Sequence, residues 1–401
     1  MGRVPAVAVA AVLGLALAGC SPAGRGSAPA VAPEDATATA VTPTPPPTTR
    51  LGGPGGSGPW GPGPSGPSGS ATAGSAPPGS FSLLFTGDML VHDAVRERAA
   101  RYAGGDGFDF RPMLVVVAPI IRSADWAVCH QETPISADNT RLSGYPAFNA
   151  PLQLAEAERW AGYDACSTAS NHTVDRGAAG VRATLDTYDR LGIRHVGSAR
   201  TVDESRRLTI YTVRGVRVGH LAYTYGLNGI APPTPWSVNL VDPARIRADA
   251  ARIRAAGARF VVVSLHFGDE KDQRPSAYQR RVADAVMSSP DVDLVVGHHA
   301  HVVQPVQRRA DGRWVIFGVG NFLAQQVVTP PDLTPPHRDG VIVRVTVAPR
   351  GGHYVVSRVG YVPTFVDAPS DVVRLAPPFS RQRTVASVTA LGAPVVDDTP
   401  H

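Results

Sequence analysis

The stretch of residues 293–306 constrains this 401-residue chain more than any other. It reads as a short buried strand, Leu294–Val296, that ends at Gly297 and is followed by histidines at three of the next four positions. His299 and His301, with one residue between them, can direct two imidazoles at one centre, and imidazole is the commonest metal-binding side chain near neutral pH. The stretch therefore indicates a metal site at a strand end, although a solvated loop would show the same pattern.

Metal-type side chains also follow the ends of other predicted strands. Helical patterns such as Gly177–Leu191 and Pro243–Ala256 alternate with these strands, which predicts an α/β sheet. Ligands bind at the carboxyl edge of such a sheet. Each side chain alone could be a turn residue, a cap, a surface acid or a core histidine, but their joint occurrence at one edge predicts a single site. The set comprises Asp88, Glu132, Asn171, His172, His266, His299 and His301.

The first part of the chain carries targeting signals instead of a fold. Residues 1–20 combine Arg3 with a short apolar run that ends in Leu-Ala-Gly-Cys, which predicts a lipoprotein signal peptide with Cys20 as the lipidated residue. An ordinary secretory signal would change the anchoring but not the compartment. Residues 21–79 are mainly Pro, Gly, Ala, Ser and Thr, and this composition predicts a disordered linker. We therefore expect an extracytoplasmic lipoprotein anchored to the outer face of the cell membrane.

The other cysteines and the net charge add less. Cys129 and Cys166 lie in short apolar runs and are interpreted as buried thiols, although an oxidising compartment permits a disulfide. The formal charge of +5 gives weak attraction to an anionic polymer, and no basic run is dense enough to predict nucleic-acid binding. We expect the folded domain at residues 80–375 and a weakly structured tail at 376–401.

Seven motifs between about Phe81 and Leu323 resemble the CapA family of poly-γ-glutamate capsule synthesis proteins, relatives of the calcineurin-like metallophosphoesterases. The resemblance implies a four-layered α/β/β/α sandwich with its metal site at the strand ends. In chain order the motifs are FTGDML (85–90), QETP (131–134), FNAPL (148–152), STASNHTVDRGAAGV (167–181), VSLHFGDE (263–270), GHHAHVVQPV (297–306) and GVGNFL (318–323).

The resemblance also implies roles for the site residues. It implies two divalent metal ions (Mn, Fe or Zn) that would activate a water molecule. Asp88 and His301 would bind the first ion, Glu132 would bridge both ions, and the second ion would be bound by Asn171, His266 and His299. Asp88 and His172 are the expected catalytic residues, and His172 would protonate the leaving oxygen.

Two positions depart from the family pattern. The phosphoesterase relatives have Asp-x-His in the first motif, whereas Leu90 stands here at the histidine position. The first ion thus lacks one ligand, so a mononuclear or empty site is an alternative, and His92 lies further along the chain. His130 precedes the QETP motif, and we expect it to face substrate or solvent, with an added metal ligand as the alternative.

The expected function is that of a cell-envelope lipoprotein in capsule synthesis, acting as a metal-dependent hydrolase on a phosphoester or an envelope polymer. The alternative is a non-catalytic component of capsule assembly or export, whose cleft binds an anionic polymer through Arg141, Arg176 or Arg274. A purely structural role is disfavoured by the number of ligand-type residues. The expected partners are the envelope polymer or the capsule synthesis and export machinery, and the membrane.

Overall fold

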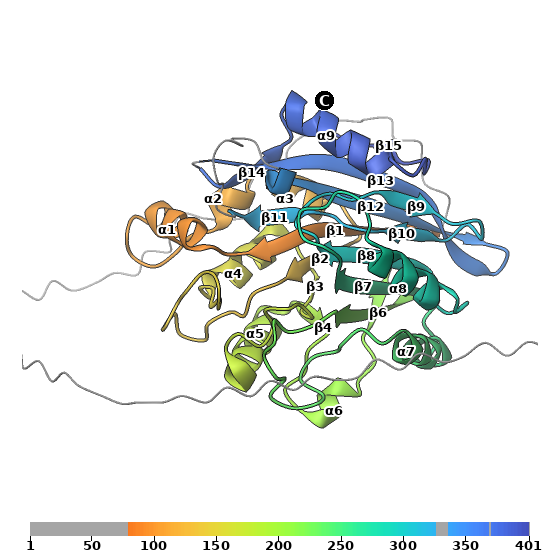
Figure 1. Ribbon diagram of the computed structural model, residues 1–401, viewed down its shortest axis with the longest axis horizontal. Coiled ribbons are helices and arrows are strands. Elements are labelled where there is room, and N and C mark those ends of the chain that lie inside the picture. The colour runs from red at the N-terminus through yellow and green to blue at the C-terminus, as the bar shows by residue number, and fades with distance from the viewer. Residues whose placement is uncertain (1–78, 326–335, 369, 401) are drawn as a thin grey trace, which may run out of the picture. The chain divides into compact units, whose positions relative to one another are not determined.

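Two β-sheets lie face to face at the centre of the fold (Figure 1). The computed structural model of the chain describes residues 79–325, 336–368 and 370–400. The first sheet has the strand order β14-β13-β12-β1-β2-β3-β4, with β11 beside β1 and β15 beside β13, and the second has the order β5-β6-β7-β8-β10-β9. The first sheet consists of β1 (Phe81–Leu90), β2 (Trp126–Gln131), β3 (Ala165–Ser167), β4 (Arg194–Val196), β11 (Asn321–Ala324), β12 (Asp339–Arg350), β13 (His353–Asp367), β14 (Val372–Leu375) and β15 (Val396–Asp397). The second consists of β5 (Ile210–Val213), β6 (Val216–Thr224), β7 (Phe260–Phe267), β8 (Leu294–His299), β9 (Val306–Arg308) and β10 (Trp314–Ile316).

Helices cover the outer faces of both sheets and complete four layers. The first sheet packs against α1 (Asp93–Tyr102), α2 (Arg111–Leu114), α3 (Ala118–Arg122), α4 (Gln153–Ala161) and α5 (Gly177–Leu191). The second sheet packs against α7 (Pro243–Ala255) and α8 (Ala277–Met287). The short helices α6 (Val202–Ser205) and η1 (Pro336–Arg338) lie in connections, and α9 (Pro378–Thr389) packs against β13 and β12. The expected α/β/β/α architecture is confirmed.

Side chains that alternate along each central strand belong to two different hydrophobic cores, one between the sheets and one under the outer helices. In β1, Leu84 faces the helices, while Phe85 faces the second sheet together with Val128 of β2. In β7, Val262 faces the first sheet and Val263 faces the outer helices. Successive side chains of a strand point to opposite faces, so each central strand contributes to two cores.

Parallel pairing sets where the strands end. Strands β1 to β4 are parallel to one another, as are β6, β7, β8 and β10. Their carboxyl ends therefore lie along one edge of each sheet. Two glycines allow close approach there: a Cβ on Gly87 would lie 2.0 Å from the Gly320 carbonyl oxygen, and one on Gly297 would lie 1.9 Å from that of Phe317. Larger residues at either position would separate the chain segments that carry the site.

A disulfide joins Cys129 and Cys166, which stand opposite each other in the parallel pair of β2 and β3, with their Cα atoms 4.5 Å apart. The sequence left open whether these cysteines are thiols or a disulfide, and the structure shows the disulfide. Each cysteine is followed by a polar residue, His130 and Ser167, whose side chains are joined at 2.7 Å. The disulfide thus fixes the spacing of two strands directly before they reach the polar edge.

The structure agrees with several predicted elements and adds others. Helix α5 has the predicted bounds, and Gly192 closes it with a φ of 71°; α7 begins after Asp242, whose carboxylate accepts two hydrogen bonds from the first turn. Helices α1 and α4 were not predicted. The predicted signal peptide and all but the last residue of the predicted linker lie outside the described residues.

Helix α9 corrects the expectation of a weakly structured tail at 376–401. Its buried residues are Ser380, Thr384, Ser387 and Val388, so a hydrophobic period is nearly absent from its sequence. The Ser380 hydroxyl instead donates a hydrogen bond to buried Asp339, at 2.6 Å. Within the described residues, no helix has the length and apolar character needed to cross a membrane.

Candidate metal centre

The predicted ligands converge where the carboxyl ends of the two sheets meet. The first sheet contributes Asp88, Glu132 and Asn171, and the second contributes His266, His299 and His301. Asp88 lies within β1, at a shift of register, instead of following the shorter strand that the sequence predicted. All six side chains are buried: Asp88, Glu132, Asn171, His266, His299 and His301 are each 3% exposed or less.

One half of the site is formed by Asp88 and His301. The Asp88 Oδ2 atom lies 3.2 Å from His301 Nδ1 and accepts a hydrogen bond from the His299 backbone N–H, also at 3.2 Å. His301 Nε2 lies 3.7 Å from Glu132 Oε1. A carboxylate from each of two strands of the first sheet thus faces the loop that follows β8.

The other half is formed by His266 and Asn171. His266 Nε2 lies 2.8 Å from Asn171 Oδ1 and 3.8 Å from the same Glu132 Oε1 atom. The rings of His266 and His299 are 4.7 Å apart. Glu132 therefore stands between the two halves, within 4 Å of a histidine nitrogen on each side.

Several atoms of the centre have no hydrogen-bond partner among the described residues, although they are buried. They are Asp88 Oδ1, both carboxylate oxygens of Glu132, His298 Nδ1 and His299 Nδ1. Buried polar groups are almost always paired, and an unpaired buried carboxylate is expensive. Within this centre, potential ligand atoms that lie within 4.8 Å of one another form two groups, Asp88/His130/His298 and Glu132/His299/His301. The donor set of carboxylate oxygens and imidazoles fits divalent metal ions.

Burial and neighbouring charges shift the pKa values of the site residues in opposite directions. Burial acts to raise the pKa of Asp88, but the adjacent side chains of His298 and His301 lower that pKa well below its ordinary value. Burial raises the pKa of Glu132 well above its ordinary value. Burial opposes protonation of His301, yet the charges of Glu132 and Asp88 raise its pKa to about 9. Burial lowers the pKa of His299 to about 3. The site thus concentrates unfavourable charge interactions that a cation would relieve.

The histidine loop has an unusual backbone. His299 and His301 have φ values of 87° and 57°, in the left-handed region that residues with a Cβ rarely adopt. Such conformations cluster at functional sites. Asn321, from the GVGNFL motif, orients His301: its Oδ1 lies 3.0 Å from His301 Nδ1, and its Nδ2 donates a hydrogen bond to the His337 carbonyl oxygen at 2.8 Å. The sequence motif contained this residue, but its role was not predicted.

His172 lies beside the ligands and is held by a carboxylate. Its Nδ1 is 2.8 Å from Asp175 Oδ2, and that oxygen also accepts a hydrogen bond from the Phe148 backbone N–H at 2.8 Å. The Phe148 ring meets the edge of His172 with centroids 4.7 Å apart. The Nε2 atom is thereby left as the nitrogen of His172 that can act on a ligand. His92 contacts the other side of Phe148 and joins neither ligand group.

His130 is placed differently from what the sequence suggested, and His298, for which no role was predicted, lies beside it. His130 is 1% exposed, which corrects the expectation of a substrate-facing or exposed residue. Its Nε2 lies 2.9 Å from His266 Nδ1, and its ring stacks on His298 at 4.1 Å. His298 Nδ1 lies 3.3 Å from Asp88 Oδ1. His298, the first of the three histidines that follow Gly297, thus lies directly beside Asp88.

Two further residues near the site had no sequence signal beyond their place after β6. The Tyr225 ring lies 4.5 Å from the His299 ring and is 41% exposed. Asn228, with a φ of 52°, accepts a hydrogen bond from Asn171 Nδ2 at 3.1 Å and places its own Nδ2 atom 3.5 Å from His172 Nε2. This loop therefore borders the face of the site that His172 occupies.

The arginines suggested for polymer binding differ in whether their side chains are already engaged by other residues. Arg176 donates hydrogen bonds to the Ser143 hydroxyl and to the Ala147 carbonyl oxygen, so it holds a loop in place. Arg274 is paired with Asp272 at 3.2 Å. Arg141 is exposed, with a φ of 51°. None of the three contacts a residue of the metal centre in the described structure.

Comparison with known proteins gives one family match. The family described as bacterial capsule synthesis protein PGA_cap matches residues 82–326. The capsule biosynthesis protein CapA of Bacillus anthracis is 27% identical over 254 residues, which cover 61% of this chain and 60% of the relative. The PGA biosynthesis protein CapA of Bacillus subtilis is 26% identical over 263 residues, covering 61% of this chain and 63% of the relative. The chain thus spans less than two thirds of either relative.

Among solved structures, the calcineurin-like phosphoesterase YfkN from Bacillus subtilis aligns with a TM-score of 0.43 and 14% sequence identity. The alignment covers 76% of this chain and 95% of that structure.

Proposed function

The chain belongs to the bacterial capsule synthesis family PGA_cap, and from this premise we propose that it is a metal-dependent hydrolase of the cell envelope. Its substrate is a phosphoester or a bond within an envelope polymer of the poly-γ-glutamate type. The observation that carries the proposal is the position of Glu132: among the described residues its two buried oxygens lack hydrogen-bond partners, and its Oε1 atom lies between His301 and His266.

In this proposal the residues would hold two divalent ions. Asp88 and His301 would bind one, Asn171, His266 and His299 would bind the other, and Glu132 would contribute to both. When bound, such ions would supply an activated water and stabilise the charge of the transition state. The chain's own contribution is to bury the ligands and fix their orientation.

His298 supports a complete first site despite Leu90. In the family pattern a histidine stands where this chain has Leu90, and the structure leaves His298 Nδ1 unpaired, 3.3 Å from Asp88 Oδ1. We therefore assign His298 to the Asp88 side of the centre. His130 has both nitrogens engaged, by Ser167 and His266, so it is a positioning residue that supports the ring of His266.

His172 is the proposed general acid. Asp175 accepts a hydrogen bond from the Nδ1–H group of His172, and this bond keeps Nε2 directed at the space bordered by Asn228. A histidine placed beside the leaving oxygen can protonate it as the bond breaks. The Phe148 ring contacts His172, and the Tyr225 ring contacts His299.

The location is also part of the proposal. A lipid on Cys20 and the following linker would place the domain outside the cell membrane, where capsule polymer is assembled. The partners are then the anionic polymer or the capsule synthesis and export machinery, in agreement with the names of the Bacillus relatives.

The decisive experiment is elemental analysis of the purified protein after reconstitution with Mn, Fe or Zn. We expect about two equivalents of metal in the unaltered protein. The substitutions His266→Ala and His299→Ala should each lower the metal content, because each removes a ligand nitrogen. His353→Ala is the matched control, since His353 is an exposed histidine at the start of β13.

Unchanged stoichiometry in both site variants would refute the ligand assignment. One equivalent in the unaltered protein would show that the Asp88 side is incomplete in spite of His298. No metal after reconstitution would refute the hydrolase and favour a non-catalytic component that binds the polymer.

A further inference from the structure

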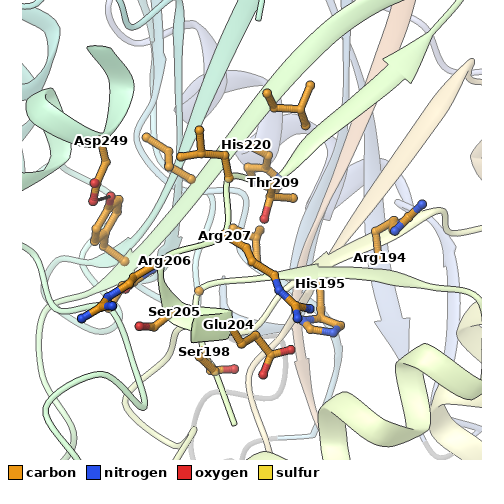
Figure 2. A pocket seen from close by; sticks show the side chains of 18 of the residues that line it. Arg194, His195, Ser198, Glu204, Ser205, Arg206, Arg207, Thr209, His220 and Asp249 are labelled. Carbon is orange, nitrogen blue, oxygen red and sulfur yellow. Dashed lines mark hydrogen bonds between the residues drawn. The ribbon is translucent and has the colours of Figure 1, made fainter. Parts of the chain in front are cut away.

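A cavity lies at the open edge of the sandwich, away from the ligand set. Strand β4 is the edge of the first sheet and β5 is the edge of the second. Between them, a cavity of about 400 Å³ is lined by β4, β5, β6, α7 and the segment 197–209, which contains α6 (Figure 2). Its volume falls within the roughly 300–1,000 Å³ that small-ligand sites occupy. None of the proposed metal ligands lines it.

The lining of this edge cavity is strongly basic. It contains six arginines and three acidic residues. The three acids are already engaged: Asp189 and Glu204 pair with Arg200 at 2.7 and 2.5 Å, and Asp249 pairs with arginines of α7. Three arginines are therefore neutralised, and these ion pairs make one wall of the cavity rigid.

The guanidinium groups of the other three arginines have no counter-charge among the described residues. Arg194, Arg206 and Arg207 all line the cavity, and in this part of the chain their side chains form no salt bridge and donate no hydrogen bond; Arg206 accepts one from Arg252 through its backbone carbonyl oxygen. Arg194 comes from β4, and Arg206 and Arg207 come from the segment after α6 (Figure 2). Positive charges that line a concave surface reinforce one another and attract anions more strongly than isolated surface arginines do.

The floor of the edge cavity is polar but uncharged. His220 lies there, 1% exposed, with its Nδ1 atom 3.2 Å from the Tyr211 hydroxyl and its Nε2 atom 2.9 Å from the Ser264 hydroxyl. Burial lowers the pKa of His220 to about 3, so the ring stays neutral. Thr209 adds a further hydroxyl to the lining. The cavity thus offers hydrogen-bonding groups inside and unpaired guanidinium groups around them.

We propose that this edge cavity is a second, metal-independent binding site for an anionic ligand that carries at least two carboxylate or phosphate groups. Arg194, Arg206 and Arg207 bind the anionic groups, and the hydroxyls of the floor bind the rest. Arginine suits this role because its planar fork matches carboxylate and phosphate oxygens in pairs. The site does not depend on the proposed hydrolase activity, because it shares no residue with the metal centre.

The test is titration calorimetry of the full chain with two probes, pyrophosphate and tricarballylate, at fixed ionic strength. Pyrophosphate represents the phosphate source and tricarballylate the carboxylate source. Each titration is run on the protein as purified and again after chelation, so that binding through a metal ion is separated from binding in the cavity. The variant is the triple substitution Arg194→Gln, Arg206→Gln and Arg207→Gln.

The matched control removes three arginines elsewhere: Arg281→Gln, Arg308→Gln and Arg350→Gln. These residues are exposed and do not line the cavity, and their substitution lowers the net charge by the same amount as the cavity variant does. We expect the cavity variant to bind at least one probe about tenfold more weakly or worse, while the control variant binds within about twofold of the unaltered protein. The stronger probe identifies the source of the anionic groups.

Equal weakening in both triple variants would mean that net charge alone attracts the probe, and it would overturn the proposal. So would the failure of both probes to bind the unaltered, chelated protein below about 10 mM, a weaker affinity than specific sites show. Circular dichroism of each variant checks that the exposed substitutions leave the fold intact.

Discussion

Glu158 of helix α4 is a buried acid outside the metal centre, and it makes stability depend on pH. The side chain is fully buried; its Oε2 atom accepts a hydrogen bond from the Tyr188 hydroxyl at 2.9 Å, and its Oε1 atom has no partner among the described residues. Burial raises its pKa from 4.5 to about 8. The folded protein therefore keeps a proton that the unfolded chain loses above pH 4.5, so stability falls as pH rises from about 4.5 to 8.

The size of this effect follows from the pKa difference. Each pH unit within that window lowers the free energy of unfolding by about 1.4 kcal/mol. Between pH 6 and pH 8 the loss is about 2 kcal/mol, because the slope falls as the folded-state acid begins to ionise near pH 8; this is still a large share of the stability of an ordinary domain. Glu158→Gln has nearly the shape of the protonated acid and cannot ionise, so it should remove this contribution. Relative to the unaltered protein, the variant should gain about 2 kcal/mol between pH 6 and pH 8.

The assay is urea unfolding of both proteins at pH 6, 7 and 8 in the presence of chelator, followed by circular dichroism. Comparison of the two proteins at each pH cancels the contributions of all other titrating groups. Glu156→Gln is the control, because Glu156 is an exposed acid on the same helix. A difference between the Glu158 variant and the unaltered protein that stays constant over this range would refute the reasoning.

Two further predictions concern the proposed acid and the anchor. Asp175→Asn should lower the turnover of a phosphodiester such as bis(p-nitrophenyl) phosphate by about tenfold or more, because His172 loses the carboxylate that orients it, while elemental analysis shows unchanged metal content. Equal rates in the two proteins would remove His172 from the mechanism. Cys20→Ser should move the protein from the membrane fraction to the soluble fraction on immunoblots, because no lipid can be attached. Continued membrane association would identify the apolar run as an uncleaved anchor.

The central part of the fold could be predicted because its strands are buried on both faces. Phe260–Phe267, for example, is buried at every position and begins with four apolar residues, and α5 and α7 carry clear periodicity or a capping residue. Helix α9 could not be predicted, because serine and threonine occupy most of its buried positions. The disulfide was undetermined for a similar reason: the register of β2 against β3 brings Cys129 and Cys166 together, and register is not visible in separate strands.

The site shows the same division. The structure places the six predicted side chains near one another, since the carboxyl ends of parallel strands meet at one edge, while their role as ligands stays a prediction. The burial of His130 depends on stacking between β2 and β8, a contact between sheets that no local pattern encodes. Tyr225 and Asn228 lie on a loop, and their proximity to the site follows from the path of the chain after β6.

The two-sheet origin of the ligands has a mechanical consequence. Asp88 and Glu132 belong to one sheet and His266 and His299 to the other. An ion bound between them would therefore cross-link the two sheets of the sandwich. Any sliding of one sheet over the other would stretch the coordination bonds, and any ion tight enough to resist sliding would raise the melting temperature by mass action. In such an arrangement, the same ions that take part in the reaction would also restrict the movement of one sheet relative to the other at this edge.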